Sequence, residues 1–120
     1  MIPTSHHRKT LALLFCATLS ITATAVAAAD DIAAGRAKAQ SCAVCHGALG
    51  VSVTPDAPNL AGQPALYVAA QLRAYRNNTR KHEVMSVMAQ SLSDADIALL
   101  ADWFASIKIE AQAGSGQSRP

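Results

Sequence analysis

The sequence predicts one small all-α domain that follows a removable export segment. Three observations lead to this prediction. The 120 residues allow one domain at most. Two segments carry apolar side chains at helical spacing, and no segment alternates convincingly between apolar and polar residues as a half-buried strand would. The first 29 residues differ in composition from the rest of the chain.

Residues 1–29 have the order of regions found in a secretory signal peptide. A basic start precedes a nearly uncharged stretch, Leu11–Val26, which ends in small residues. Cleavage after Ala27 or after Ala29 fits this pattern equally well. The alternative is a retained membrane anchor, but the strongly apolar run of about 16 residues is shorter than the roughly 20 that a spanning helix needs. We therefore expect export to the periplasm and no stable membrane insertion after cleavage.

The mature chain would have about 90 residues, with its domain at 30–110. Of three cysteines, Cys16 lies in the apolar part of the signal and would be lost with it. Without Arg8 and Lys9, eight basic side chains balance eight acidic ones. No basic face with interleaved aromatics is present, so nothing indicates a nucleic-acid partner. So short a domain has a thin core, which some other apolar mass must complete.

The first expected helix covers Ile32–Ser41, where alanines favour helix and Asp30 or Asp31 can cap its positive end. Residues 47–62 contain glycines and prolines and should form a loop. The residues 111–120 are small and polar, which predicts a disordered tail.

Two further helices are expected. One opens at Gln63-Pro64, since proline is allowed in a first turn, and runs to about Arg76, where Asn77-Asn78-Thr79 breaks it. The last begins at Ser93, and Asp96 three residues on resembles a capping box, although glutamate is the usual partner. The apolar faces of the two helices consist of Val68, Leu72 and Tyr75, and of Ile97, Leu100, Ala101 and Phe104, with Trp103 flanking the second.

The strongest chemical signal is Cys42-Ala43-Val44-Cys45-His46, the attachment motif for c-type haem. Two cysteines three residues apart on a helical turn can reach the two vinyl groups at one edge of the porphyrin and form thioethers. His46 then lies under the iron and can bind it through a ring nitrogen. The motif predicts one covalently bound haem c and its iron.

The same residues could also serve other purposes. Cys42 and Cys45 could form a structural disulfide after export. A thioredoxin-like redox site also contains Cys-x-x-Cys, but it would need a preceding strand and a βαβ scaffold, which the sequence lacks. A zinc site would need four ligands, for which Cys42, Cys45, His46 and His82 could be proposed.

A second axial ligand for the iron could come from Met85, Met88 or His82. Methionine with histidine is a common ligand pair in c-type cytochromes. The residue types alone leave the two methionines nearly equal. An open iron position is the remaining alternative, and it would indicate a haem enzyme or a gas sensor.

Several segments together resemble a class I cytochrome c, and particularly one half of the bacterial dihaem cytochromes c and their small monohaem relatives. They follow the family order through nearly the whole mature chain: Cys42-Ala43-Val44-Cys45-His46-Gly47, Pro58-Asn59-Leu60-Ala61-Gly62-Gln63, Tyr67 with Gln71-Leu72, Met85-Ser86-Val87-Met88, Leu92-Ser93-Asp94-Ala95-Asp96-Ile97 and Ala101-Asp102-Trp103-Phe104. The resemblance implies about three to five short helices wrapped around one haem. This chain has one haem motif, so a second haem would have to be on another protein.

The resemblance also implies residue roles. The family's ligand methionine lies eight residues before the serine that opens the last helix, which corresponds to Met85. Gly35 falls where the first helix crosses the last, and Trp103 matches the aromatic that packs there.

Around the haem, the resemblance implies that the Pro58 carbonyl accepts the ring N–H of the haem histidine, which orients the ring and makes it more basic. Leu60 and Tyr67 would line the haem pocket. The basic run Arg73, Arg76, Arg80 and Lys81 has two interpretations that the sequence leaves open. It is either a solvated surface or a feature that pairs a haem propionate or docks an acidic partner.

A protein of this kind would be a periplasmic carrier of single electrons between redox proteins and not an enzyme. It would act as a monomer or in transient complexes. The alternative is a cytochrome subunit of a larger dehydrogenase or sulfur-oxidising complex.

Overall fold

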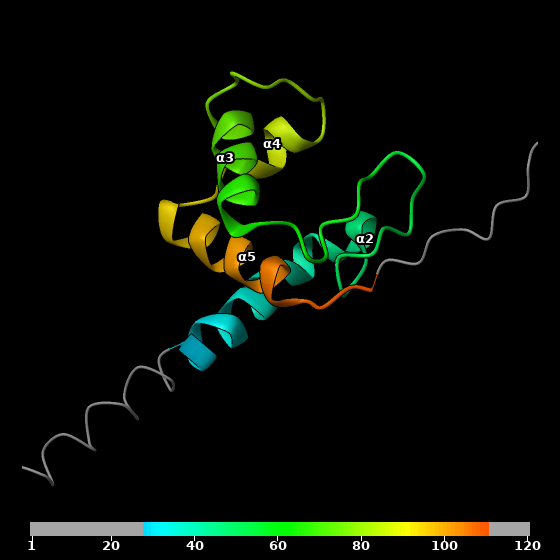
Figure 1. Ribbon diagram of the computed structural model, residues 1–120. Coiled ribbons are helices and arrows are strands. Elements are labelled where there is room, and N and C mark those ends of the chain that lie inside the picture. Colours follow the sequence, from blue (N-terminus) through cyan, green and yellow to red (C-terminus); the bar gives the residue numbers. More distant parts are fainter. Residues whose placement is uncertain (1–27, 111–120) are drawn as a thin grey trace, which may run out of the picture.

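The computed structural model describes residues 28–110. Most of the predicted signal peptide, with the Ala27 cleavage point, and the predicted tail lie outside these residues. The described part contains an N-terminal helix (28–38), the 3-10 turn η1 (Ala39–Ser41), α2 (Ala43–His46), α3 (Ala65–Arg76), α4 (Met85–Gln90) and α5 (Asp94–Ser106) (Figure 1). No strand occurs among residues 28–110, which confirms the all-α prediction. Within the same range, no helix is both long and apolar enough to cross a membrane.

The N-terminal helix differs from the expected helix over Ile32–Ser41. It is already helical at residue 28, and its last turn tightens into η1. Asp30 and Asp31 therefore lie inside the helix and do not cap it. Ala28 and Ala29 explain the difference, because alanine has the highest helix propensity and continues the helix through the two acidic residues.

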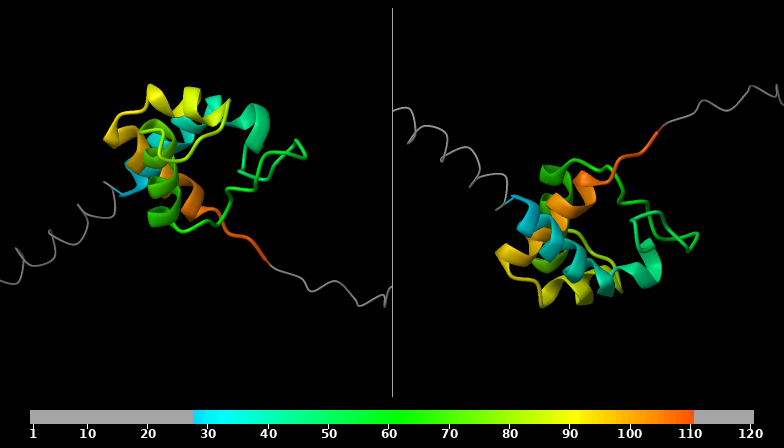
Figure 2. Two further views of the ribbon diagram at one scale, coloured as in Figure 1. Left: turned by 90° about the horizontal axis from the view of Figure 1, so that it is seen from above. Right: turned by 90° about the horizontal axis from the view of Figure 1, so that it is seen from below.

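The N-terminal helix crosses α5, and Figure 2 shows this crossing from two opposite sides. At the crossing, a Cβ on Gly35 would meet the Leu99 carbonyl oxygen and lie 2.9 Å from the Cβ of Trp103. The two backbones are thus close enough that only glycine fits. On its other side α5 packs against α3, and the buried core there includes Val68, Ile97, Leu100, Ala101 and Phe104.

The start of α5 is a complete capping box. The Ser93 hydroxyl accepts a hydrogen bond from the Asp96 backbone N–H at 3.1 Å, and the Asp96 carboxylate accepts one from the Ser93 backbone N–H at 3.0 Å. Aspartate therefore serves where glutamate is usual. The Lys38 ammonium lies 2.7 Å from the same carboxylate. Asp96 thus joins the start of α5 to the end of the N-terminal helix.

We predict that Asp96→Asn makes folding stability less sensitive to acid. The hydrogen bond from Lys38 first, and then those from the Ser93 backbone and hydroxyl, lower the Asp96 pKa from 3.8 to about 2. A carboxyl whose pKa is lower in the folded state stabilises fully above its unfolded pKa and loses that contribution as pH falls through the folded pKa. The variant should therefore be less stable than wild type at neutral pH.

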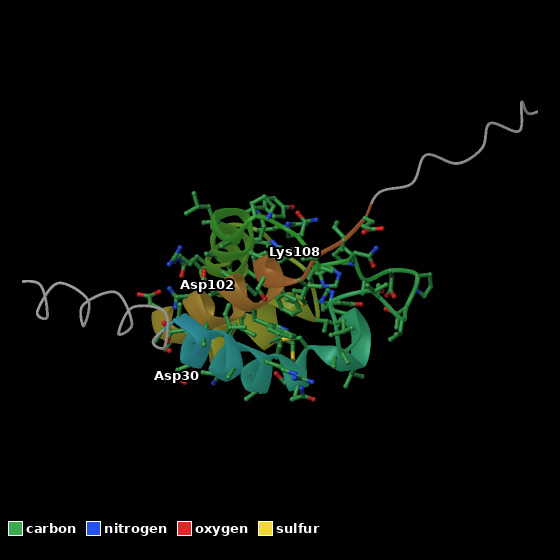
Figure 3. All side chains as sticks on the ribbon, turned by 60° about the horizontal axis from the view of Figure 1, so that its bottom comes forward. Asp30, Asp102 and Lys108 are labelled. Atoms are coloured by element: carbon green, nitrogen blue, oxygen red, sulfur yellow. The ribbon has the colours of Figure 1, made fainter. Side chains whose placement is uncertain are left out.

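The stability difference between Asp96→Asn and wild type should then shrink between pH 4 and pH 2. Denaturant unfolding of the haem-bearing protein, followed by circular dichroism at each pH, measures it. Asp102→Asn is the matched control, because Asp102 is an exposed carboxylate on the same helix (Figure 3). A difference that stays constant down to pH 2 would contradict the assigned role of Asp96.

Candidate haem site

A cavity of about 600 Å³ opens between α2, the loop 47–62, α3 and α4. This volume is within the roughly 300–1,000 Å³ typical of cofactor pockets. Most of its lining is apolar. The residues that the sequence assigned to haem attachment, to the iron and to the haem pocket all border it: Cys42, Cys45, His46, Pro58, Leu60, Tyr67 and Met85. The fold therefore brings together segments that are more than 40 residues apart in the sequence.

The two cysteines are placed by α2. The His46 backbone N–H donates to the Cys42 carbonyl at 2.9 Å, so the motif forms one helical turn. Both thiols border the cavity, and neither is in a disulfide. Burial raises the pKa of the Cys42 thiol, and the hydrogen bond with Ser41 lowers it by a smaller amount. Cys42 is therefore a neutral thiol in an apolar wall.

His46 is buried, with 7% of its surface exposed. Its Nδ1 lies 2.9 Å from the Pro58 carbonyl oxygen. Since a carbonyl can only accept, this contact requires the ring proton on Nδ1 and leaves Nε2 as the basic nitrogen. The contact also fixes the plane of the ring, so the side chain is pre-oriented as a metal ligand.

The loop that carries Pro58 is held by its own hydrogen bonds. The Ser52 backbone N–H donates to the Asn59 side-chain oxygen at 2.7 Å. The Leu60 backbone N–H donates to the Gly50 carbonyl at 2.7 Å. Gly50 has φ +69°, and a Cβ there would lie 2.9 Å from the Phe104 ring. A glycine is thus required where the loop turns back towards α5.

The methionine side of the cavity is built by α4, which the sequence analysis did not predict. Met85 and Met88 are three residues apart on this helix, and both border the cavity. Met85 is partly buried, whereas 43% of Met88 is exposed.

His82 organises the start of α4. Its Nδ1 accepts hydrogen bonds from the backbone N–H groups of Val84 at 3.2 Å and of Met85 at 3.3 Å. Its own backbone N–H donates to the Ser86 hydroxyl at 3.1 Å. His82 therefore does for α4 what a capping residue does, because it satisfies donors that have no partner within the helix.

The competing interpretations of the motif find no support in the described residues. A thioredoxin-like site needs a strand before the motif and a cysteine of lowered pKa, whereas residues 28–110 contain no strand and the Cys42 pKa is raised. The proposed zinc ligands do not assemble either, since no group of three or more His, Cys, Asp or Glu side chains in that range is arranged to hold a metal.

Sequence reasoning missed several residues that border the cavity. Leu100 and Phe104 of α5 do so, and they had been assigned only to the core. Gln71 borders it as well, and so does Arg80, for which the sequence had left two interpretations open. The three-residue spacing of Met85 and Met88, which is that of one helix face, was the one sequence signal for α4.

An all-α fold and a mainly apolar cavity with two free thiols, a pre-oriented histidine and a methionine define a protein that binds haem covalently. Comparison with known families agrees, because residues 32–108 match the family described as Cytochrome c. The chain belongs to the cytochrome c family. It is an electron carrier, and it holds one haem c.

Comparison with curated proteins shows which members of the family the chain is similar to. It is 44% identical over 81 residues to cytochrome c-554(548) of Halomonas halodenitrificans, an alignment that covers 65% of this chain and 98% of the relative. It is 44% identical over 82 residues to cytochrome c4 of Pseudomonas aeruginosa, which covers 68% of this chain and 41% of the relative. It is also 41% identical over 69 residues to the thiosulfate dehydrogenase electron acceptor of Stutzerimonas stutzeri, with 55% and 32% covered. The chain thus spans the first relative almost completely and less than half of the other two.

Proposed function

We propose that this chain is an exported monohaem cytochrome that carries single electrons between redox proteins in the periplasm. In this proposal Cys42 and Cys45 hold the haem through thioethers, and His46 and Met85 bind its iron. Pro58, Leu60 and Tyr67 form part of the pocket. The observation that carries the proposal is that all seven residues border one cavity, although they come from separate segments.

When bound, haem supplies an iron that cycles between two oxidation states. The protein's part would be to hold that iron through His46 and Met85. The Pro58 carbonyl keeps the His46 ring in one orientation and leaves Nε2 basic. Leu60 and Tyr67 line the cavity and would contribute apolar surface against the bound haem. With His46 and Met85 both bound, the iron would have no position open to a substrate, and for this reason we propose no catalytic activity.

The periplasmic location rests on the composition of residues 1–29, which is typical of an export signal. Covalent attachment suits that compartment, because a thioether-bound cofactor cannot be lost by dissociation. Electron carriers meet their partners through small, transient contacts, so we expect a monomer that forms short-lived complexes.

The second candidate function is electron transfer with one particular sulfur-oxidising dehydrogenase. The chain would be either the electron acceptor of that enzyme or its cytochrome subunit. The observation in its favour is the 41% identity to the thiosulfate dehydrogenase electron acceptor of Stutzerimonas stutzeri. Stable co-purification with a single dehydrogenase at native expression would favour this function over that of a freely diffusing carrier.

Optical spectroscopy tests the proposal directly. The full chain is expressed in a periplasm equipped for haem attachment, and spectra are recorded for the oxidised, the reduced and the carbon monoxide-treated reduced protein, and in alkaline pyridine. In alkaline pyridine we expect the spectrum of a haem attached through two thioethers. The protein itself should show sharp low-spin bands, and those of the reduced form should not shift with carbon monoxide. A ready shift would indicate an open iron. Absence of haem, with a control cytochrome matured in the same cells, would refute the proposal.

A further inference from the structure

The four cations of the basic run lie in different surroundings. Arg76 faces α5, where its guanidinium donates to the Leu92 carbonyl at 3.0 Å and to the Asp94 carboxylate at 2.7 Å. Arg73 is 3.8 Å from the same carboxylate. Arg80 borders the haem cavity, and within residues 28–110 no other arginine or lysine is part of its lining. The run is thus a structural pair, Arg73 and Arg76, followed by one cation at the cofactor site, Arg80, and by Lys81, which is exposed and not part of the lining.

The turn after α3 is what directs Arg80 to the cavity. Asn78 takes φ 58°, in the left-handed region, and the Arg80 backbone N–H then donates to the Ala74 carbonyl at 3.1 Å. The Thr79 hydroxyl donates to the same carbonyl at 3.2 Å. The chain therefore folds back along the last turns of α3, and Arg80 lies over the face of α3 that lines the cavity.

Two residues of α3 hold the guanidinium in place. It donates to the Gln71 side-chain oxygen at 2.6 Å, and its central carbon lies 4.7 Å from the centroid of the Tyr75 ring. Gln71 and Tyr75 also border the cavity. Because the Gln71 oxygen accepts from Arg80, the NH₂ group of Gln71 remains a donor. The arrangement is a set of N–H donors, fixed before any ligand arrives, at the edge of an apolar pocket.

A haem carries two propionates at the edge of the porphyrin away from the vinyl groups. The vinyl edge is bound where the thiols are, on α2, whereas Arg80 and Gln71 belong to α3 and the turn after it. A carboxylate at an apolar site needs a charged or hydrogen-bonding partner, and arginine presents a fork that matches it. We propose that Arg80 and Gln71 bind a haem propionate, an assignment that rests on the proposed function of this cavity.

The proposal has a redox consequence. A fixed positive charge near the haem favours the reduced iron, which carries one positive charge less than the oxidised iron. In Arg80→Gln, we expect the equilibrium to shift about tenfold towards the oxidised form, which equals a midpoint potential about 59 mV lower for a one-electron couple. Redox titration of the haem-bearing protein measures this, and resonance Raman bands of the propionates report the lost contact independently of potential.

Lys81→Gln is the matched control, because it removes the same charge from the neighbouring residue, which is not part of the cavity lining. It should shift the equilibrium less than threefold and leave the propionate bands unchanged. Arg80→Lys, which keeps the charge, should recover most of the potential but not the propionate bands of wild type. Equal shifts in Arg80→Gln and Lys81→Gln, with unchanged propionate bands in both, would overturn the proposal.

Gln71→Ala gives an independent variant should Arg80→Gln accumulate poorly. It removes the second donor and the group that positions Arg80, so the propionate bands should change there too. Unchanged bands in that variant would also contradict the proposal. Covalent haem with low-spin spectra in all these variants would leave the proposed electron-carrier function intact even if the propionate assignment fails.

Discussion

Met85→Ala is expected to free a coordination position on the haem iron, so that the reduced iron binds carbon monoxide readily. The variant should keep its covalent haem, because the thioethers come from Cys42 and Cys45. Loss of the methionine ligand should also lower the midpoint potential by on the order of 100 mV, since methionine ligation raises it. Carbon monoxide difference spectra and a redox titration of the purified protein measure both effects.

Met88→Ala is the control for this experiment. Met88 has the same side chain and lies on the same helix, but 43% of it is exposed, whereas Met85 is partly buried. The control should remain low-spin and unreactive towards carbon monoxide. If Met88→Ala opened the iron and Met85→Ala did not, the ligand assignment would have to be exchanged between the two methionines.

Gly35→Ala is expected to destabilise the folded protein by about 3 kcal/mol, at the upper end of the usual cost of overpacking. The added Cβ would meet the Leu99 carbonyl and the Trp103 Cβ, which is 2.9 Å away, so the N-terminal helix could no longer lie against α5. The loss is large for a domain whose total stability is of the order of 5–15 kcal/mol. Urea unfolding of the haem-bearing protein, followed by circular dichroism, gives the difference.

Helix propensity acts in the opposite direction at this position. In a free helix, Gly→Ala stabilises by up to about 1 kcal/mol. A loss of stability in Gly35→Ala would therefore indicate crowding, and a gain would indicate helix propensity. Ala33→Gly, at an exposed position of the same helix, measures the propensity alone and should cost about 1 kcal/mol. A Gly35→Ala variant as stable as wild type would show that crowding between the two helices costs no more than the roughly 1 kcal/mol gained in helix propensity.

The relatives suggest how such a domain is used in longer proteins. The chain matches less than half of cytochrome c4 from Pseudomonas aeruginosa and almost all of cytochrome c-554(548) from Halomonas halodenitrificans. A domain of this size can therefore be a whole protein or one part of a longer one.

The features that the sequence determined by itself are local ones. The haem motif is complete in five residues, from Cys42 to His46, because attachment needs only two thiols and a base on one helical turn. The boundaries of α3 and α5 follow from Pro64, from the Asn77-Asn78-Thr79 break and from the capping pair Ser93 and Asp96. Hydrogen bonds and dihedral preferences within a few residues decide such features.

Tertiary structure alone decided the rest. The helix α4 has only six residues, too few for a hydrophobic period, and the backbone N–H groups at its start donate to His82, a role that no sequence pattern indicates. Arg76 and Arg80 are the same residue type four positions apart, yet one faces Asp94 and the other the haem cavity. That difference is produced by the turn at Asn78 and by where α5 packs. The position of α5 is fixed by contacts between segments distant in the sequence, and a linear pattern of residue types does not record them.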